Sequence, residues 1–70
     1  MTELRSYARV GSTLYLVTTG DLFRGAYETV VFAVSGQRKN VMNEVHRQFY
    51  DKKEDAVRAH REIFDSLRIQ

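Results

Sequence analysis

The spacing of apolar and polar residues changes once along the chain. Up to residue 50, short runs rich in β-branched and aromatic side chains alternate with polar positions, which is typical of β-strands. Beyond residue 51, apolar residues recur at the spacing of a helix. The pattern predicts strands over residues 4–10, 13–19, 26–34 and 41–50, and a helix over residues 52–68.

The helix is predicted from both its start and its faces. Asp51 can cap the first amides, and Glu54 follows three residues later as in a capping box. Charged residues fill the outer side of the helical wheel. Because His60 lies among the apolar residues, we expect a packed imidazole that is hydrogen-bonded to the sheet or to the loop around Phe23. The apolar side consists of Ala56, Val57, His60, Ile63, Phe64 and Leu67.

The predicted strands differ in how clearly they alternate. Residues 26–34 are apolar on both alternating sets, which favours a central strand. Residues 41–50 alternate less cleanly, and their assignment rests on β-branched and aromatic side chains that lead into the helix. Residues 4–10 form an optional further strand, joined to the next one through Gly11.

These elements predict one domain over residues 1–70 of the α+β class. We expect two layers, with a three- or four-stranded, mostly antiparallel sheet and one C-terminal amphipathic helix, because the connections are too short for parallel crossovers. A single helix covers one face, and function is expected on the other. We expect that other face to carry some of Tyr7, Tyr15, Tyr27, Met42, His46 and Tyr50.

Composition narrows the class of protein. The 70 residues are 43% hydrophobic and 29% charged, which indicates a folded domain rather than a linker. The chain has no Cys, which excludes disulfides, thiolate metal sites and a cysteine nucleophile. A domain this small and without such staples gains its stability from tight packing or from a partner chain, so we expect a homo-oligomer, most simply a homodimer, or a surface that docks on another protein. Residues 1–10 lack a signal-like apolar stretch and no membrane span is present, so we expect a cytoplasmic protein.

Catalytic chemistry finds little support in the sequence. Glu44 and His46 would share one face of a regular strand and could form an acid–base pair, but we favour the interpretation of a half-exposed polar pair on a solvated strand. The segment Gly20–Gly25 has the glycine spacing of a phosphate-binding loop, but Ala26 and Tyr27 stand where Lys and Ser or Thr are needed. We therefore expect no enzyme, no cofactor and no metal site, and interpret this segment as a strand connection.

That connection supplies a candidate binding site for a partner protein. Leu22, Phe23 and Arg24, with Tyr27 nearby, would make an anchor if exposed, because aromatic and Arg side chains dominate interface energies. A buried Phe23 is the alternative.

A nucleic-acid-binding sheet face is the second class of function. It would use Arg5, Arg9, Arg38, Lys39 and Arg47, with interleaved tyrosines for stacking. Against it, the net charge is only +2, and Glu28 and Glu44 fall within the same sheet.

Short motifs give one family resemblance over residues 27–67. The strand Glu28–Phe32, the aromatic Tyr50, and Ala56 with His60 resemble features of small uncharacterised proteins of tailed bacteriophages. The segment 35–45 departs from that pattern. The resemblance implies a phage accessory protein in the host-cell cytoplasm without defining an activity.

Two further resemblances supply the rival function. Lys52, Lys53, Glu54 and Ala56 resemble the helix start of arm-type DNA-binding domains of phage integrases, and the Glu-x-Ala spacing is similar to that of HicB-like antitoxins. The integrase catalytic domain and the glycine-rich strand end of the antitoxins are missing. Our first hypothesis is a non-enzymatic protein-binding module of phage or mobile-element type that docks on a partner protein and, in one version, inhibits it. The alternative is a DNA- or RNA-binding module.

Overall fold

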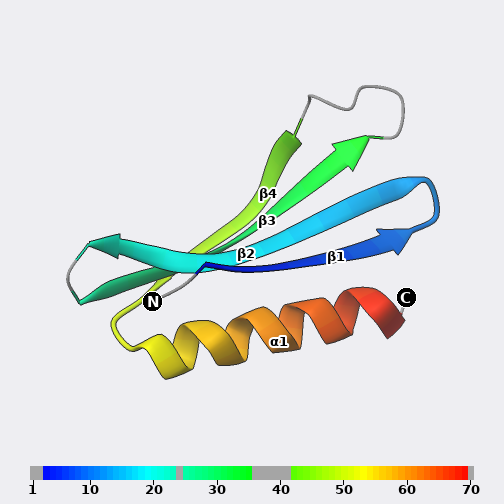
Figure 1. Ribbon diagram of the computed structural model, residues 1–70. Coiled ribbons are helices and arrows are strands. Elements are labelled where there is room, and N and C mark those ends of the chain that lie inside the picture. The colour runs from blue at the N-terminus through cyan, green and yellow to red at the C-terminus, as the bar shows by residue number, and fades with distance from the viewer. Residues whose placement is uncertain (1–2, 24, 36–41, 70) are drawn as a thin grey trace.

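The computed structural model shows a two-layer α+β fold, described over residues 3–23, 25–35 and 42–69 (Figure 1). Four strands form one sheet in the order β1-β2-β3-β4, and each neighbouring pair is antiparallel. The predicted fold class is confirmed, with four strands rather than three. The elements are β1 (Leu4–Val10), β2 (Thr13–Phe23), β3 (Ala26–Ser35), β4 (Met42–Tyr50) and α1 (Lys53–Ile69).

Strand β2 extends four residues beyond its predicted end at residue 19. Gly20 pairs with Glu28 inside the sheet instead of opening a loop. The register shifts between Asp21 and Phe23, and Phe23 then pairs with Ala26. Gly25 has a φ of 77°, a left-handed conformation that glycine adopts without a Cβ clash. The segment Gly20–Gly25, which we expected to be a connection, is therefore mostly strand and ends in a tight turn.

Helix α1 lies along one face of the sheet and starts at the same end as the β2–β3 turn (Figure 1). It packs over β1, β2 and β3 and contacts β4 least. The contact centres on side chains that are almost fully buried, among them Val17 and Ala56 with no exposed area. Small residues at this contact, including Ala8 on β1, let the helix backbone approach the strands closely.

The other face is covered by no described element, and we call it the open face. Strand register assigns its side chains, because residues that pair across strands share a face. Its β1 members are Arg5, Tyr7 and Arg9, its β2 members are Leu14, Leu16, Thr18 and Gly20, its β3 members are Glu28, Val30, Phe32 and Val34, and its β4 members are Glu44, Arg47 and Phe49.

A β-bulge in β4 corrects one sequence-based expectation. Val31 pairs with His46 while the next residue, Phe32, pairs with Glu44, so Val45 is an extra residue. Such an insertion reverses the alternation beyond it. Glu44 therefore lies on the open face and His46 on the helix side, and the prediction that they share a face is wrong.

Most aromatic residues considered for the uncovered face lie on the helix side. Tyr7 is on the open face as expected, whereas Tyr15, Tyr27, His46 and Tyr50 belong to the opposite set. The side chain of Met42 lies outside the described residues. The physical reason is that both faces of β2 and β3 are apolar, so alternation alone cannot tell which face the helix covers.

Candidate functional site

The β2–β3 turn presents two large apolar side chains to solvent. Phe23 is 72% exposed and Leu22 is 41% exposed, so the alternative of a buried Phe23 is wrong. Arg24 lies outside the described residues. Tyr27 pairs with Tyr50 in the sheet and is half-buried on the helix side. The structure thus brings Leu22 and Phe23 together and separates Tyr27 from them; we call these two residues the hairpin tip.

The centre of the open face is apolar and its margins are charged. Leu14, Leu16, Val30, Phe32 and Val34 form the centre, and of these Leu16 and Val30 are buried by their neighbours. Two aromatic rings flank it, with Tyr7 on β1 at 56% exposure and Phe49 on β4 at 57%. An uncovered sheet face was expected from the sequence, but its apolar centre was not assigned to it, although Val30, Phe32 and Val34 alternate on one side of β3.

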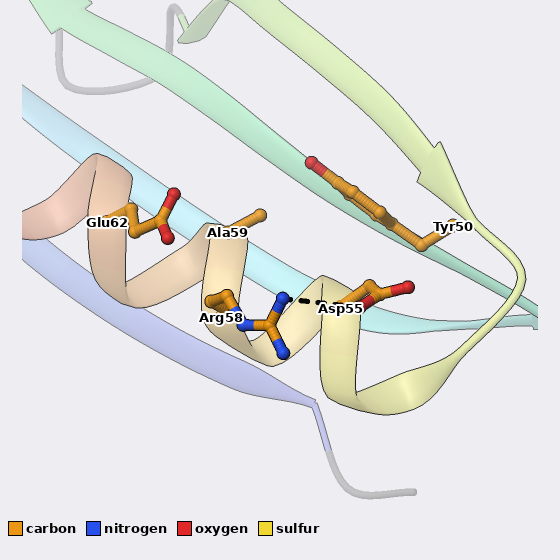
Figure 2. A pocket seen from close by; sticks show the side chains of 5 residues that line it. All are labelled: Tyr50, Asp55, Arg58, Ala59 and Glu62. Atoms are coloured by element: carbon orange, nitrogen blue, oxygen red, sulfur yellow. Dashed lines mark ion pairs between the residues drawn. The ribbon is translucent and has the colours of Figure 1, made fainter.

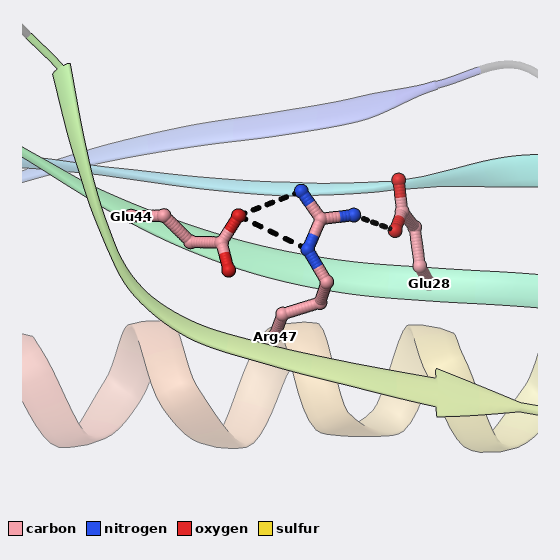
Figure 3. Close-up of polar contacts among 3 residues, drawn as sticks. All are labelled: Glu28, Glu44 and Arg47. Atoms are coloured by element: carbon pink, nitrogen blue, oxygen red, sulfur yellow. Dashed lines mark hydrogen bonds and ion pairs between the residues drawn. The ribbon is translucent and has the colours of Figure 1, made fainter.

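Arg47 is held on the open face by two carboxylates (Figure 3). Its Nε and Nη2 donate to Oε1 of Glu44 at 3.0 Å and 2.7 Å, and its Nη1 donates to Glu28. The hydrogen bond from Arg47 lowers the pKa of Glu44, and the bond to Glu44, with the charge of Glu28, raises the pKa of Arg47. The guanidinium is drawn toward β3, where Val30 is the registered neighbour of Arg47 and is only 2% exposed.

The cations proposed for nucleic-acid binding share a face but do not gather. Arg5 and Arg9 lie on β1 and Arg47 on β4, at opposite edges of the sheet about 14 Å apart at a strand spacing of about 4.8 Å. Arg5 donates to Glu3 at 3.2 Å, and this bond raises its pKa. Arg38 and Lys39 lie outside the described residues.

A chain of buried hydrogen bonds joins the helix to the sheet. Thr29 Oγ1 donates to the carbonyl of Ala56 at 3.1 Å and lies 2.7 Å from Thr19 Oγ1. Thr19 Oγ1 lies 2.9 Å from Nδ1 of His60, and Nε2 of His60 lies 2.8 Å from Ser6 Oγ. The expected bond from His60 to the sheet is confirmed.

The positions of the hydroxyl protons determine which tautomer of His60 fits this chain of hydrogen bonds. Thr29 uses its one proton on Ala56 and must accept from Thr19, so Thr19 accepts from Nδ1–H of His60. Nε2 then accepts from Ser6 in the neutral ring. Burial lowers the pKa of His60, which favours this neutral form.

This arrangement makes stability depend on pH through His60. The pKa of the folded state lies below 6.5, the ordinary value, so the unfolded chain takes up a proton first as pH falls. The contribution of His60 to the free energy of unfolding is complete above pH 6.5. It is lost as pH falls from there through the folded-state pKa, by at most about 1.4 kcal/mol per pH unit. Urea unfolding of wild type and His60→Gln at several pH values should show the advantage of wild type shrinking toward pH 5.

His46→Gln is the control, because His46 is exposed on β4. This substitution leaves the hydrogen bonds of His60 to Ser6 and Thr19 in place. An unchanged pH slope in His60→Gln would contradict the neutral, buried imidazole.

A shallow pocket of about 330 Å³ lies between the end of β4 and the helix (Figure 2). The ring of Tyr50 borders it, and the pKa of Tyr50 is raised by burial and by the charges of Glu62 and Asp55. Arg58 lies 3.6 Å from Asp55 in an ion pair. The pocket offers a phenol and carboxylates without a nucleophile paired to a base. Its lining is Tyr50, Asp55, Arg58, Ala59 and Glu62.

Metal and membrane sites were also sought in the described segments. They contain no group of three or more His, Asp or Glu side chains placed to hold a metal ion. Within these residues no helix has the length and apolarity of a membrane span. The chain matches no protein-family model, no curated protein and no solved structure.

Proposed function

We propose that this protein is a small non-enzymatic binding module that docks on a partner protein through its hairpin tip. The observation that carries the proposal is the exposure of Phe23, at 72% the most exposed of the large apolar side chains in the described residues. Leu22 lies beside it at 41%. Aromatic side chains, Phe included, are enriched in protein interfaces, where a few residues carry most of the binding energy.

The backbone around the tip supports this use. Only two residues separate Phe23 from Ala26, and Gly25 holds the turn at positive φ. A tight turn on a sheet loses little conformational entropy when a partner binds. The register shift at Leu22 interrupts alternation just before the turn. The tip is therefore presented by a paired strand rather than by a long loop.

The placement of the histidines supports a binding role over a hydrolytic one. Glu44 and His46 lie on opposite faces of β4, which removes the acid–base pair considered from the sequence. His60 is buried, with both ring nitrogens engaged by hydroxyl groups. Ser6 donates to Nε2 of His60, but the other ring nitrogen meets the Thr19 hydroxyl rather than a carboxylate, and His60 is only 7% exposed.

Nucleic-acid binding through the sheet is the weaker candidate. Arg47 is neutralised by Glu28 and Glu44, and Arg5 is paired with Glu3. A phosphate backbone would have to compete with these carboxylates, and the carboxylates would repel it.

A photocrosslinking residue placed at Phe23 tests the proposal in cells that naturally express the protein. We expect it to capture a discrete protein, which is then purified for binding measurements. Phe23→Ala should weaken the affinity for that protein by about thirtyfold, the effect of losing a binding hot spot. The salt dependence should be slight because the contact is apolar.

The same crosslinker at Ser66, on the exposed side of α1, is the control and should not capture that protein. Identical capture from both positions, or capture of nucleic acid alone, would overturn the proposal. Binding of a mixed-sequence DNA duplex at low salt that is lost in Arg9→Ala would favour the nucleic-acid alternative.

A further inference from the structure

The open face has the layout of an association surface. Its apolar centre spans β2 and β3, and the rings of Tyr7 and Phe49 lie exposed on either side. Charged side chains occupy the margins. An apolar core within a polar rim is the usual anatomy of protein interfaces, and monomeric soluble proteins rarely leave extended apolar patches uncovered.

The charges of the open face indicate what kind of partner fits it. Among the described residues of this face, three side chains are positive and three negative, so their charges sum to zero. These six charges offer no long-range attraction to a strongly acidic or strongly basic partner. A second copy of the same face can place its positive side chains against the negative side chains of the first copy, and its negative side chains against the positive ones. The six are Glu3, Arg5, Arg9, Glu28, Glu44 and Arg47, with Glu3 placed here by its contacts to Arg5 and to the Gly20 position.

We infer that a second copy of this chain covers the open face, turned about a two-fold axis that crosses the strands. The axis lies over the open face, above the backbone of four paired positions that form one line across the sheet. These positions are Ser6, Val17, Val31 and His46. This line lies midway along the open face, so rotation about it overlaps all rows of side chains.

Rotation about that axis matches opposite charges. Arg9 of one copy falls opposite Glu3 of the other, and Arg47 falls opposite Glu44. An axis parallel to the strands would instead set Arg5 over Arg47, two cations. The inference goes beyond the proposed function and does not depend on the hairpin tip, so either can fail while the other stands.

Sedimentation equilibrium of the full chain tests the inference. Wild type should have a mass near 16.4 kDa, twice the 8.2 kDa of one chain. Tyr7→Glu and Phe49→Glu should each raise the dissociation constant about tenfold or more, because each buries a charge in the interface. Both positions are more than half exposed, so folding should persist, and circular dichroism checks it. Ser66→Glu adds the same charge on α1 and should stay dimeric.

A charge exchange tests the direction of the axis. Arg9→Glu alone sets carboxylates against Glu3 and should weaken the dimer about tenfold. Adding Glu3→Arg should recover most of that loss. A monomeric wild type, or a dimer that Tyr7→Glu and Phe49→Glu leave intact, would overturn the second-copy inference. Failure of the exchange to recover affinity would overturn the axis across the strands.

Discussion

Replacing Thr19 by valine is expected to lower the free energy of unfolding by about 2–3 kcal/mol. Valine keeps the shape of threonine but removes the hydroxyl that accepts from His60 and donates to Thr29. A buried ring nitrogen then loses its partner, whichever tautomer His60 adopts. The total stability of a 70-residue domain is about 4–10 kcal/mol, so the loss is a large fraction of it.

Urea unfolding of Thr19→Val and Thr18→Val measures this effect with a matched control. Thr18 is the neighbouring threonine, half-exposed on the open face, and its replacement should change stability by no more than about 0.5 kcal/mol. Equal losses in the two variants would show that the hydroxyl of Thr19 contributes nothing.

Replacing Ala56 by leucine is expected to cost about 2–4 kcal/mol by overpacking the helix against the sheet. Ala56 has no exposed area, and its carbonyl accepts the hydrogen bond of Thr29. A larger side chain pushes α1 away from β3 and lengthens that bond. His60, one helical turn further on, is drawn away from Thr19 by the same movement.

Ala59→Leu is the matched control for this helix. Ala59 borders the pocket beside Tyr50, where there is space of about 330 Å³, so a leucine should be accommodated within about 1 kcal/mol. Chemical denaturation of both variants gives the comparison. A cost at Ala59 as large as at Ala56 would contradict the seating of α1 described above.

The order of elements was predictable because its signals are local. Alternation over residues 4–10 and the cap at Asp51 depend on near neighbours in sequence, and the helix begins and ends one residue later than predicted. The face that α1 covers was not predictable, because it depends on a match between small and polar side chains distant in sequence. Ser6 and His60, which bond across 54 residues, are the clearest example.

Irregularities within strands account for most of the remaining errors. The extra residue Val45 reverses alternation in β4, and β2 continues in regular register past Gly20 before the shift at Leu22. Neither has a distinctive residue type that marks it. The hairpin tip could be named from its apolar residues, but its exposure could not, since it depends on where β2 ends.

The meander topology has a consequence for how the chain folds during synthesis. Each strand pairs with the one made just before it, so the sheet can assemble through short-range hairpins that close quickly. The 17 residues of α1 are synthesised after β4, over roughly one to three seconds at ordinary ribosomal rates. During that interval Val17 and Val31 on one face, and Leu16 and Val30 on the other, are alike uncovered, and the nascent sheet is most exposed to aggregation. The synthesis of α1 thus ends that interval for one face only.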